Sequence, residues 1–312
     1  MNDRTAAGPA SARRGLWIGL VLAGVGAVSF SAKAVIVKLA YRHGVDAVTL
    51  IMLRMLVALP LFLAMVWWSG RARPGRPAPA PLSRRDVLGV AGLGFCGYYL
   101  SSYLDFLGLQ YVSASLERLI QYLTPTFVML LGWLLFGRAI TVRQWAGTAI
   151  GYAGMLLVFG HEVRFEGGSP FLGAALVLLS SLSYAVYLVY SGELVKRLGS
   201  LRLVGLATSV ACLCCIVQFL LLRPLRAAVD VAPEVLWLSL VNGTLCTALP
   251  VLLLMMAIER IGPALAAQTS MVGPLSTLAL GIVVLGEPFT TWLAGGTALV
   301  LAGIFVLTRP TR

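Results

Sequence analysis

The sequence predicts an all-α integral membrane protein: ten transmembrane helices arranged as two inverted five-helix repeats, with both termini cytoplasmic. The apolar composition, the length of the apolar blocks and an internal repeat predict this fold. Of the 312 residues, 59% are apolar and 12% are charged, whereas soluble domains average roughly 45–50% and 25%. So few charges cannot cover the surface of a soluble protein, and the composition therefore argues against soluble enzymes and disordered chains.

Ten apolar blocks reach membrane-spanning length. A span needs about 20 apolar residues, and a backbone in hydrocarbon must form its own hydrogen bonds, which favours helices. The predicted helices are 16–39, 47–68, 86–108, 112–136, 140–160, 170–193, 202–222, 235–257, 262–285 and 289–308. They divide the chain into an N-terminal cytoplasmic tail (1–15), a first five-helix repeat (16–160), a second five-helix repeat (170–308) and a C-terminal tail (309–312).

The basic residues predict the orientation of these helices. The chain carries 24 Lys and Arg against 12 Asp and Glu, a net charge of +12. If the N-terminus is cytoplasmic, most of the basic residues, including the arginines of the Pro-rich loop 69–85, fall on the inner face and few on the outer face. This is the asymmetry that the positive-inside rule describes. It accounts for the positive charge, so we expect no nucleic-acid partner.

The sequence lacks the residues that would indicate a secreted protein, a metalloprotein, an enzyme or an ATP-driven pump. Ala32-Lys33-Ala34 resembles a signal-peptide cleavage site, but the apolar region continues from Leu16 to Ala40, which is too long for a signal core. The cysteines lie in apolar segments without a nearby histidine or carboxylate, so no metal site or other cofactor is expected. The chain shows no catalytic cluster and no phosphate-binding loop of an ATPase, so we expect neither an enzyme nor a direct ATP-driven pump.

The two halves of the chain repeat each other. Shifting residues 113–158 by 149 positions lays them on the second half without a gap, with Pro125 on Pro274 and four glycines also matched. Near the start of each half, a shift of 154 positions places Lys33 on Tyr187. Because each half holds an odd number of helices, the second half must be inverted. Inverted repeats are typical of secondary transporters, whose binding site lies near the midplane, although some channels share them.

Short motifs also recur in both halves. The first half has Tyr111-Val112-Ser113-Ala114-Ser115, Leu123-Thr124-Pro125 and Leu135-Phe136-Gly137; the second has Ile261-Gly262-Pro263-Ala264, Val272-Gly273-Pro274 and Leu285-Gly286-Glu287-Pro288. With these motifs, residues 15–308 resemble the drug/metabolite transporter superfamily, in its bacterial EamA-type branch. Arg138 departs from the family pattern, which usually has the Glu seen at Glu287. The resemblance implies ten helices, a central cavity, a place in the bacterial inner membrane, and export or exchange of small metabolites such as amino acids.

Charged residues inside predicted helices are the first candidates for a transport site, because buried charge is costly and faces a cavity or a partner. They are Lys33, Arg54, Asp105, Glu117 and Arg118. Lys33, Glu117 and Arg118 share a depth of roughly 8–9 Å below the outer helix ends. In one interpretation, Lys33 or Arg118 receives an anionic group of the substrate and Glu117 exchanges a proton; in the other, the charges form a permanent ion network. Arg54 is interpreted as structural.

Polar, aromatic and proline residues complete the predicted site. Gln121 shares a helix face with Glu117, and tyrosines suit zwitterions with apolar side chains, although ordinary packing explains them as well. The predicted cavity residues beyond the charges are Tyr98, Tyr99, Gln121, Tyr122, Tyr184, Tyr187, Asn242 and Gln268. Pro125 and Pro274 are predicted inside helices, where each removes a backbone hydrogen bond and produces either a functional kink or a static bend.

These observations together predict a secondary transporter that exports small organic solutes, amino acids or related metabolites, by alternating access. Proton coupling is a hypothesis. The alternatives are efflux of drugs or toxic compounds, and a channel or lipid flippase of the same architecture. The expected partners are a small-molecule substrate, the lipid bilayer and protons, and we expect the chain to act as a monomer or a homodimer.

Overall fold

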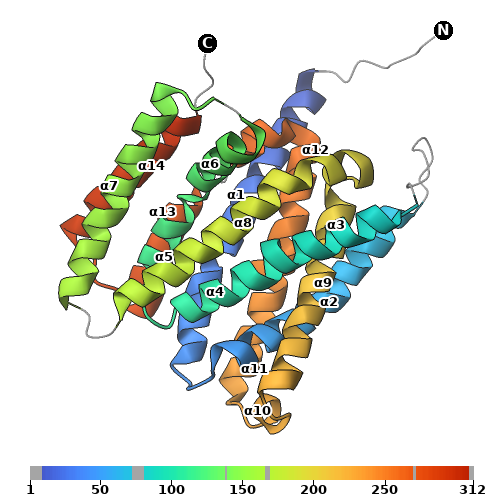
Figure 1. Ribbon diagram of the computed structural model, residues 1–312, viewed down its shortest axis with the longest axis horizontal. Helices are drawn as coiled ribbons and strands as arrows, with labels where there is room; N and C mark the ends of the chain where they lie inside the picture. The colour runs from blue at the N-terminus through green and yellow to red at the C-terminus, as the bar shows by residue number, and fades with distance from the viewer. Residues whose placement is uncertain (1–8, 72–80, 138, 166–168, 270–271, 309–312) are drawn as a thin grey trace.

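The computed structural model describes residues 9–71, 81–137, 139–165, 169–269 and 272–308. Within these residues the regular structure is entirely helical, and the helices form one bundle (Figure 1). The predicted all-α class is therefore confirmed. Helix α1 begins, and helix α14 ends, at the upper end of the bundle in Figure 1.

The helices follow the predicted spans closely. The first half contains α1 (Pro9–Tyr41), α2 (Ala47–Gly70), α3 (Arg84–Gly94), the π-helix η1 (Phe95–Leu100), α4 (Ser101–Gly108), α5 (Ala114–Gln121), α6 (Thr124–Phe136) and α7 (Val142–Phe165). The second half contains α8 (Pro170–Leu198), α9 (Ser200–Leu222), α10 (Arg226–Val229), α11 (Pro233–Gly243), η2 (Thr244–Ala248), α12 (Leu249–Thr269), α13 (Val272–Leu280), η3 (Gly281–Leu285) and α14 (Thr291–Thr308).

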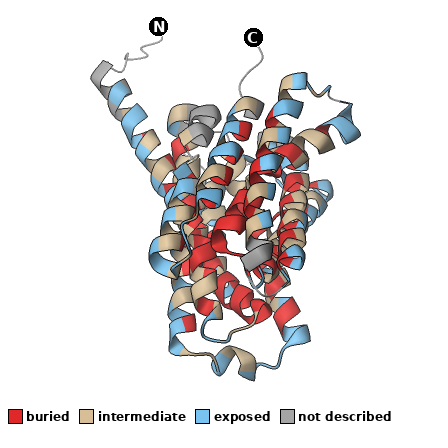
Figure 2. Ribbon diagram, turned by 90° about the vertical axis from the view of Figure 1, so that its left-hand side faces the viewer, coloured by how far each residue is buried: buried red, intermediate tan, exposed pale blue. Residues whose placement is uncertain are grey.

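Seven helical segments in the described residues are long and apolar enough to cross a membrane, and two shorter apolar segments, Leu275–Leu285 and Thr291–Val306, accompany them. Large apolar side chains such as Trp17, Leu134 and Leu221 are more than half exposed on the outside of the bundle. Buried residues gather in its middle (Figure 2). A continuous apolar exterior around a buried interior suits a lipid environment.

The observed helices α1, α7 and α8 extend five to seven residues beyond their predicted spans at one end, and two predicted spans differ in their course. The predicted helix 112–136 is broken between Gln121 and Thr124, and Pro125 lies in the first turn of α6. A proline there removes an N–H that has no acceptor within the helix, so it marks a helix start and not an interior kink. The loop predicted at 258–261 is instead helical within α12, which continues through Gly262 and Pro263 to Thr269.

The repeat is visible as matched local structure. The π-helices η1 and η2 begin at Phe95 and Thr244, which are 149 positions apart. Each follows a glycine whose missing side chain admits a neighbouring backbone: a Cβ on Gly94 would collide with a carbonyl of α9, and one on Gly243 would lie 2.7 Å from a carbonyl oxygen of α2. Both halves therefore use the same distorted helix against equivalent partners.

Helices α7 and α14, which are equivalent in the two halves, pack side by side (Figure 1). A Cβ on Gly154 would lie 2.6 Å from the Gly296 carbonyl oxygen, and one on Gly303 would lie 2.6 Å from the Gly147 carbonyl oxygen. These two contacts exchange equivalent positions, as a twofold-related pair of helices does. The glycines of α7 and α14 therefore allow the two helix backbones to approach each other closely.

Candidate functional site

Four elements, from both halves of the chain, meet around a group of buried charges. Lys33 of α1 donates to Asp105 of α4, with 2.6 Å between Nζ and Oδ2. The same ammonium lies 3.6 Å from Oε1 of Glu117 in α5. The other Asp105 oxygen accepts a hydrogen bond of 2.6 Å from Nε2 of Gln121, one turn further along α5. We call Lys33, Asp105, Glu117, Arg118 and Gln121 the ion cluster.

Arg118 links the ion cluster to the second half of the chain. Its Nε donates to the hydroxyl of Thr277 in α13 at 3.1 Å. Its terminal nitrogens donate to the backbone carbonyls of Phe30 and Ser31 at 3.4 and 3.5 Å and to the side-chain oxygen of Gln121 at 3.5 Å. All of these acceptors are uncharged. Arg118 is therefore held in place without a carboxylate directly against its guanidinium.

The ion cluster is closed off from solvent and formally balanced. Lys33 is 7% exposed, Asp105 1%, Glu117 0% and Arg118 4%, so two cations share the buried space with two carboxylates. Charges in such surroundings persist only when they compensate one another. Neither oxygen of Glu117 accepts a hydrogen bond from the described residues. Glu117 is thus the carboxylate of the ion cluster that no N–H or O–H of the described residues holds in place.

The short helix α5 positions three members of the ion cluster. It begins after Ser113, whose hydroxyl accepts the Leu116 N–H at 3.0 Å as an N-cap. Residues 114–120 are all buried. The helix ends at Gln121, before α6 begins at Thr124, so α5 is a separate segment within the predicted fourth span. Glu117 and Gln121 face the same way because they are four residues apart.

Three tyrosines form a second group, the tyrosine cluster, between η1 and α8. The Tyr98 ring meets the Tyr187 ring edge-on at 5.1 Å, and Tyr184 stacks on Tyr187 at 5.5 Å. The Tyr98 and Tyr187 hydroxyls lie 3.4 Å apart. The ring of Tyr187 packs directly against Gly97, where any side chain would collide with it. Tyr187 is the repeat equivalent of Lys33, so equivalent positions of α1 and α8 each contribute to one of the two clusters.

The remaining predicted residues lie apart from both clusters. Tyr99 stacks on Tyr103 at 6.4 Å, because consecutive residues of a helix point in different directions. Asn242 is fully buried in α11, and neither its side-chain oxygen nor its nitrogen has a hydrogen-bond partner. The side chains of Gln268 and Pro274 lie outside the described residues, although the Pro274 backbone falls in the first turn of α13.

Arg54 of α2 is a buried cation of a different kind. Its side chain contacts the Ser102 hydroxyl at 3.3 Å and the face of the Phe106 ring at 4.8 Å, and its Nε has no acceptor. In the described part of the chain no carboxylate forms an ion pair with it. Arg54 therefore stands beside the ion cluster without belonging to it.

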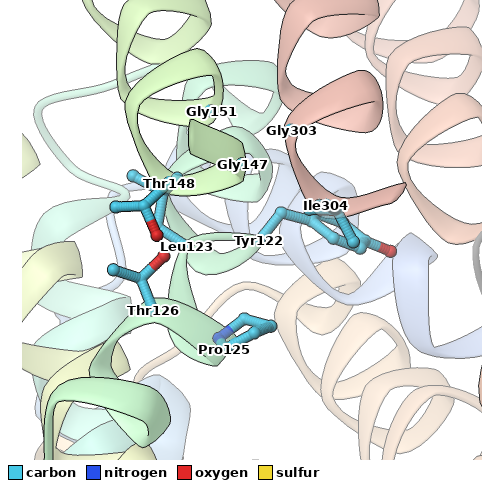
Figure 3. Close-up of a pocket in the computed structure, with 9 residues that line it drawn as sticks. All are labelled: Tyr122, Leu123, Pro125, Thr126, Gly147, Thr148, Gly151, Gly303 and Ile304. Carbon is cyan, nitrogen blue, oxygen red and sulfur yellow. The ribbon is translucent and has the colours of Figure 1, made fainter. Parts of the chain in front are cut away.

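Tyr122 lines a small pocket that lies between α6, α7 and α14 (Figure 3). The close-up shows Tyr122, Leu123, Pro125, Thr126, Gly147, Thr148, Gly151, Gly303 and Ile304 around it. The pocket has room for about one water molecule, so it does not hold a metabolite. The far end of Tyr122 reaches α13, where a Cβ on Gly273 would lie 2.6 Å from its hydroxyl oxygen.

The sequence did not predict the central place of Asp105 or the part played by Thr277. Asp105 was recognised as an intramembrane charge, but its place at the centre of the ion cluster was not predicted. Thr277 was not singled out, although its spacing of three residues from Pro274 places it one turn into α13. Among the described residues no three His, Cys, Asp or Glu side chains are grouped to hold a metal, and the five cysteines are unpaired.

Comparisons with known proteins agree with this architecture. The model of the EamA-like transporter family matches twice, at residues 17–160 and 171–309. The uncharacterized transporter YcbK of Bacillus subtilis is 31% identical over 275 residues, covering 84% of each chain. An uncharacterized transporter of Archaeoglobus fulgidus is 24% identical over 265 residues, covering 84% of this chain and 88% of its own.

A solved structure described only as "Crystal structure of protein" shares the fold, with a TM-score of 0.64 at 17% identity, covering 93% of this chain and 98% of its own. The two family matches confirm the internal repeat and the resemblance drawn from the motifs. They span most of the sequence and agree with the apolar helices of the structure, so the protein is a multi-pass membrane protein. The chain belongs to the EamA-like transporter family.

Proposed function

We propose that this protein is a secondary transporter that exports small organic solutes, amino acids or related metabolites first, and that the ion cluster is its solute site. The observation that carries the proposal is the contact between Arg118 of the first half and Thr277 of the second, within a buried and charge-balanced group. A site shared by two repeats changes shape whenever one repeat moves against the other, as alternating access requires.

Arg118 is the better candidate to receive a substrate carboxylate. Lys33 already lies within 4 Å of two carboxylates, whereas every hydrogen-bond acceptor of Arg118 is neutral. A carboxylate competes more easily with carbonyl and hydroxyl acceptors than with another carboxylate, because charge-assisted bonds are the stronger ones. An amino acid would bring such a group, and the rings of the tyrosine cluster suit apolar side chains.

Glu117 is the proposed proton carrier. A proton on Glu117 would change the formal charge of the ion cluster by one unit, and no hydrogen bond to its oxygens has to break first. Proton uptake at Glu117 and binding of an anion at Arg118 would therefore be linked through the charge of the ion cluster. Such proton coupling is expected if the charges form a transport site, whereas a permanent ion network requires no exchange of protons.

The membrane arrangement is part of the same proposal. We propose ten spans in two inverted repeats, with both termini on the cytoplasmic side of a bacterial inner membrane. The start of α1 and the end of α14 at one end of the bundle support an even number of crossings. The basic residues support the cytoplasmic assignment of that end. The chain is proposed to act as a monomer or a homodimer.

Proteoliposomes test the proposal directly. The purified protein is reconstituted, and a panel of radiolabelled amino acids and related metabolites is tested for counterflow at several pH values. We expect at least one zwitterionic solute to exchange, Glu117→Gln to flatten the pH dependence, and Arg118→Gln to abolish exchange. If both variants exchange solute with the pH response of the unmodified protein, the ion cluster is a permanent network and not the solute site.

A further inference from the structure

One contact between the repeats holds the helix that carries most of the ion cluster. The carboxylate of Glu287, just after η3, accepts the Ala114 N–H at 2.7 Å and the Ser115 N–H at 3.3 Å. It also accepts the Ser115 hydroxyl at 2.5 Å. These amides are the free donors at the N-terminus of α5, where a negative charge is most favourable. Glu287 thus closes the end of α5 from the opposite repeat.

The position of Glu287 is fixed by its own backbone. Gly286 has a left-handed conformation with φ 73°, and the Glu287 N–H donates to the Gly281 carbonyl at 3.1 Å, which closes the end of the π-helix η3. Gly281 also leaves room for the carboxylate, since a Cβ there would lie 2.7 Å from a Glu287 oxygen. Arg42 donates to the Leu285 carbonyl at 2.6 Å and holds the same turn from the first repeat.

The sequence removes every part of this contact from the equivalent place in the repeat. The counterpart of Glu287 is Arg138, whose side chain has no acceptor. The counterparts of Ala114 and Ser115 are Pro263, which has no N–H, and Ala264, which has no hydroxyl. If the contact served only the packing of the two symmetric repeats, the residues that form it would be present in both repeats. The contact therefore serves one end of the bundle only.

The opposite end is joined by a weaker link. There Arg197, at the end of α8, pairs with Asp86 near the start of α3, and the Arg197 side chain is 49% exposed. The Asp86 side chain is only 4% exposed, but water reaches the half-exposed guanidinium and weakens the pair. Glu287 instead makes three charge-assisted hydrogen bonds to a buried helix end. The two ends of the bundle therefore differ in how firmly the repeats are joined.

We propose that Glu287 is a one-sided gate residue. While it holds Ala114 and Ser115, α5 stays in place and the ion cluster is closed to the membrane face on which Glu287 lies; when it lets go, that face opens. The opposite face lacks this contact and opens more readily. The inference rests on the proposed alternating access, but its test below needs no transported solute.

Thiol labelling can measure the gate. Ser31 is 1% exposed and its backbone carbonyl touches Arg118, so Ser31→Cys reports on access to the ion cluster. The reporter is placed in a chain whose five natural cysteines are replaced by alanine, reconstituted, and exposed to a membrane-impermeant thiol reagent from either side. Phe289→Cys, which is 63% exposed beside Glu287, marks the face that carries the gate, and Leu82→Cys before α3 marks the other.

We expect Glu287→Gln and Glu287→Ala to raise the labelling rate of Ser31→Cys about tenfold or more from the Phe289 face, since a charge-assisted contact is lost. Ser115→Ala, which removes one bond, should give a smaller rise. Arg223→Gln is the matched control, because it breaks the ion pair with Asp46 that also joins the two halves of the chain but leaves α5 untouched, and its rate should not change.

Several results would overturn the proposal. An unchanged rate in the Glu287 variants that elute as folded protein would do so, as would an equal rise from both faces or the same rise in Arg223→Gln. If Glu287→Ala does not fold, Glu287→Gln and Ser115→Ala decide the matter in the same way. A panel without any transported solute would refute the proposed function, yet a one-sided rise in labelling would still establish the gate.

Discussion

The pairing of Lys33 with Asp105 makes a sharp prediction for stability. Replacing Lys33 with Met leaves Asp105 and Glu117 buried without their shared cation, and replacing Asp105 with Leu leaves Lys33 with only Glu117 at 3.6 Å. Removing one partner of a buried ion pair costs about 3–5 kcal/mol. We expect Lys33→Met near the upper value and Asp105→Leu near the lower, because Lys33 keeps one carboxylate in the second case.

The double variant separates the ion pair from its surroundings. Lys33→Met with Asp105→Leu removes one charge of each sign and leaves Gln121 without its acceptor, a loss of about 1–3 kcal/mol. The double variant should therefore be more stable than Lys33→Met alone, although it should not transport. The assay is urea unfolding of the four proteins in detergent micelles, analysed as a double-mutant cycle. If the loss of unfolding free energy in the double variant equals the sum of the losses in the two single variants, the reasoning is refuted, because Lys33 and Asp105 would then act independently.

Other regions of the bundle give three further predictions. Gly154→Leu should lower the thermal midpoint in detergent markedly, because its Cβ would lie 2.6 Å from a backbone oxygen of α14. Gly160→Ala is the control, since a Cβ there meets open space and should leave the midpoint unchanged. Equal effects of the two substitutions would contradict the packing of α7 on α14. Burial raises the pKa of the Asp46 carboxyl, but the hydroxyl and N–H of Thr49 and the Arg223 guanidinium lower it by more, so its net pKa lies below the usual value. Its contribution to stability should be fully present above the usual aspartate pKa and lost as the pH falls through the lowered pKa, and in Asp46→Asn that part of the acid-induced drop in thermal midpoint should vanish. Arg54→Met should change the free energy of unfolding by no more than about 1 kcal/mol, because the guanidinium has no ion-pair partner in the described residues to lose; a loss of 3 kcal/mol in urea unfolding would show that a partner exists.

The fold was predictable because a membrane restricts the possibilities. Length and apolar composition fix where a helix can cross, and five of the ten predicted spans lie within two residues of the observed helix limits at both ends. The observed helices extend five to seven residues beyond the predicted spans 16–39, 140–160 and 170–193 at one end. The break between α5 and α6 was missed because Pro125 was taken as an interior kink. A proline inside a helix removes a hydrogen bond, whereas a proline in the first turn removes none, because the N–H there has no acceptor in the helix. Only the position of the preceding turn distinguishes the interior proline from the first-turn proline.

The sequence predicted how deep in the membrane the charged residues lie, but not toward which neighbouring helix each side chain points. Counting residues along each helix placed Lys33 and Glu117 at one level, and the structure brings them within 3.6 Å. The rotation of each helix about its axis is set by packing, so the central position of Asp105 and the separation of Tyr98 from Tyr99 could not be read from depth alone. The contact of Glu287 with α5 joins positions 172 and 173 residues apart, and no local pattern indicates such a pairing.

The most direct test of the account is the binding of a transported solute to the purified protein in detergent, measured for the unmodified chain, Arg118→Lys and Arg118→Gln. If the ion cluster is the solute site, Arg118→Gln should bind at least about tenfold more weakly, since a charge-assisted contact to the solute is lost. Arg118→Lys, which keeps the charge, should retain part of the affinity. Unchanged affinity in an Arg118→Gln protein with a normal melting temperature would contradict the central claim.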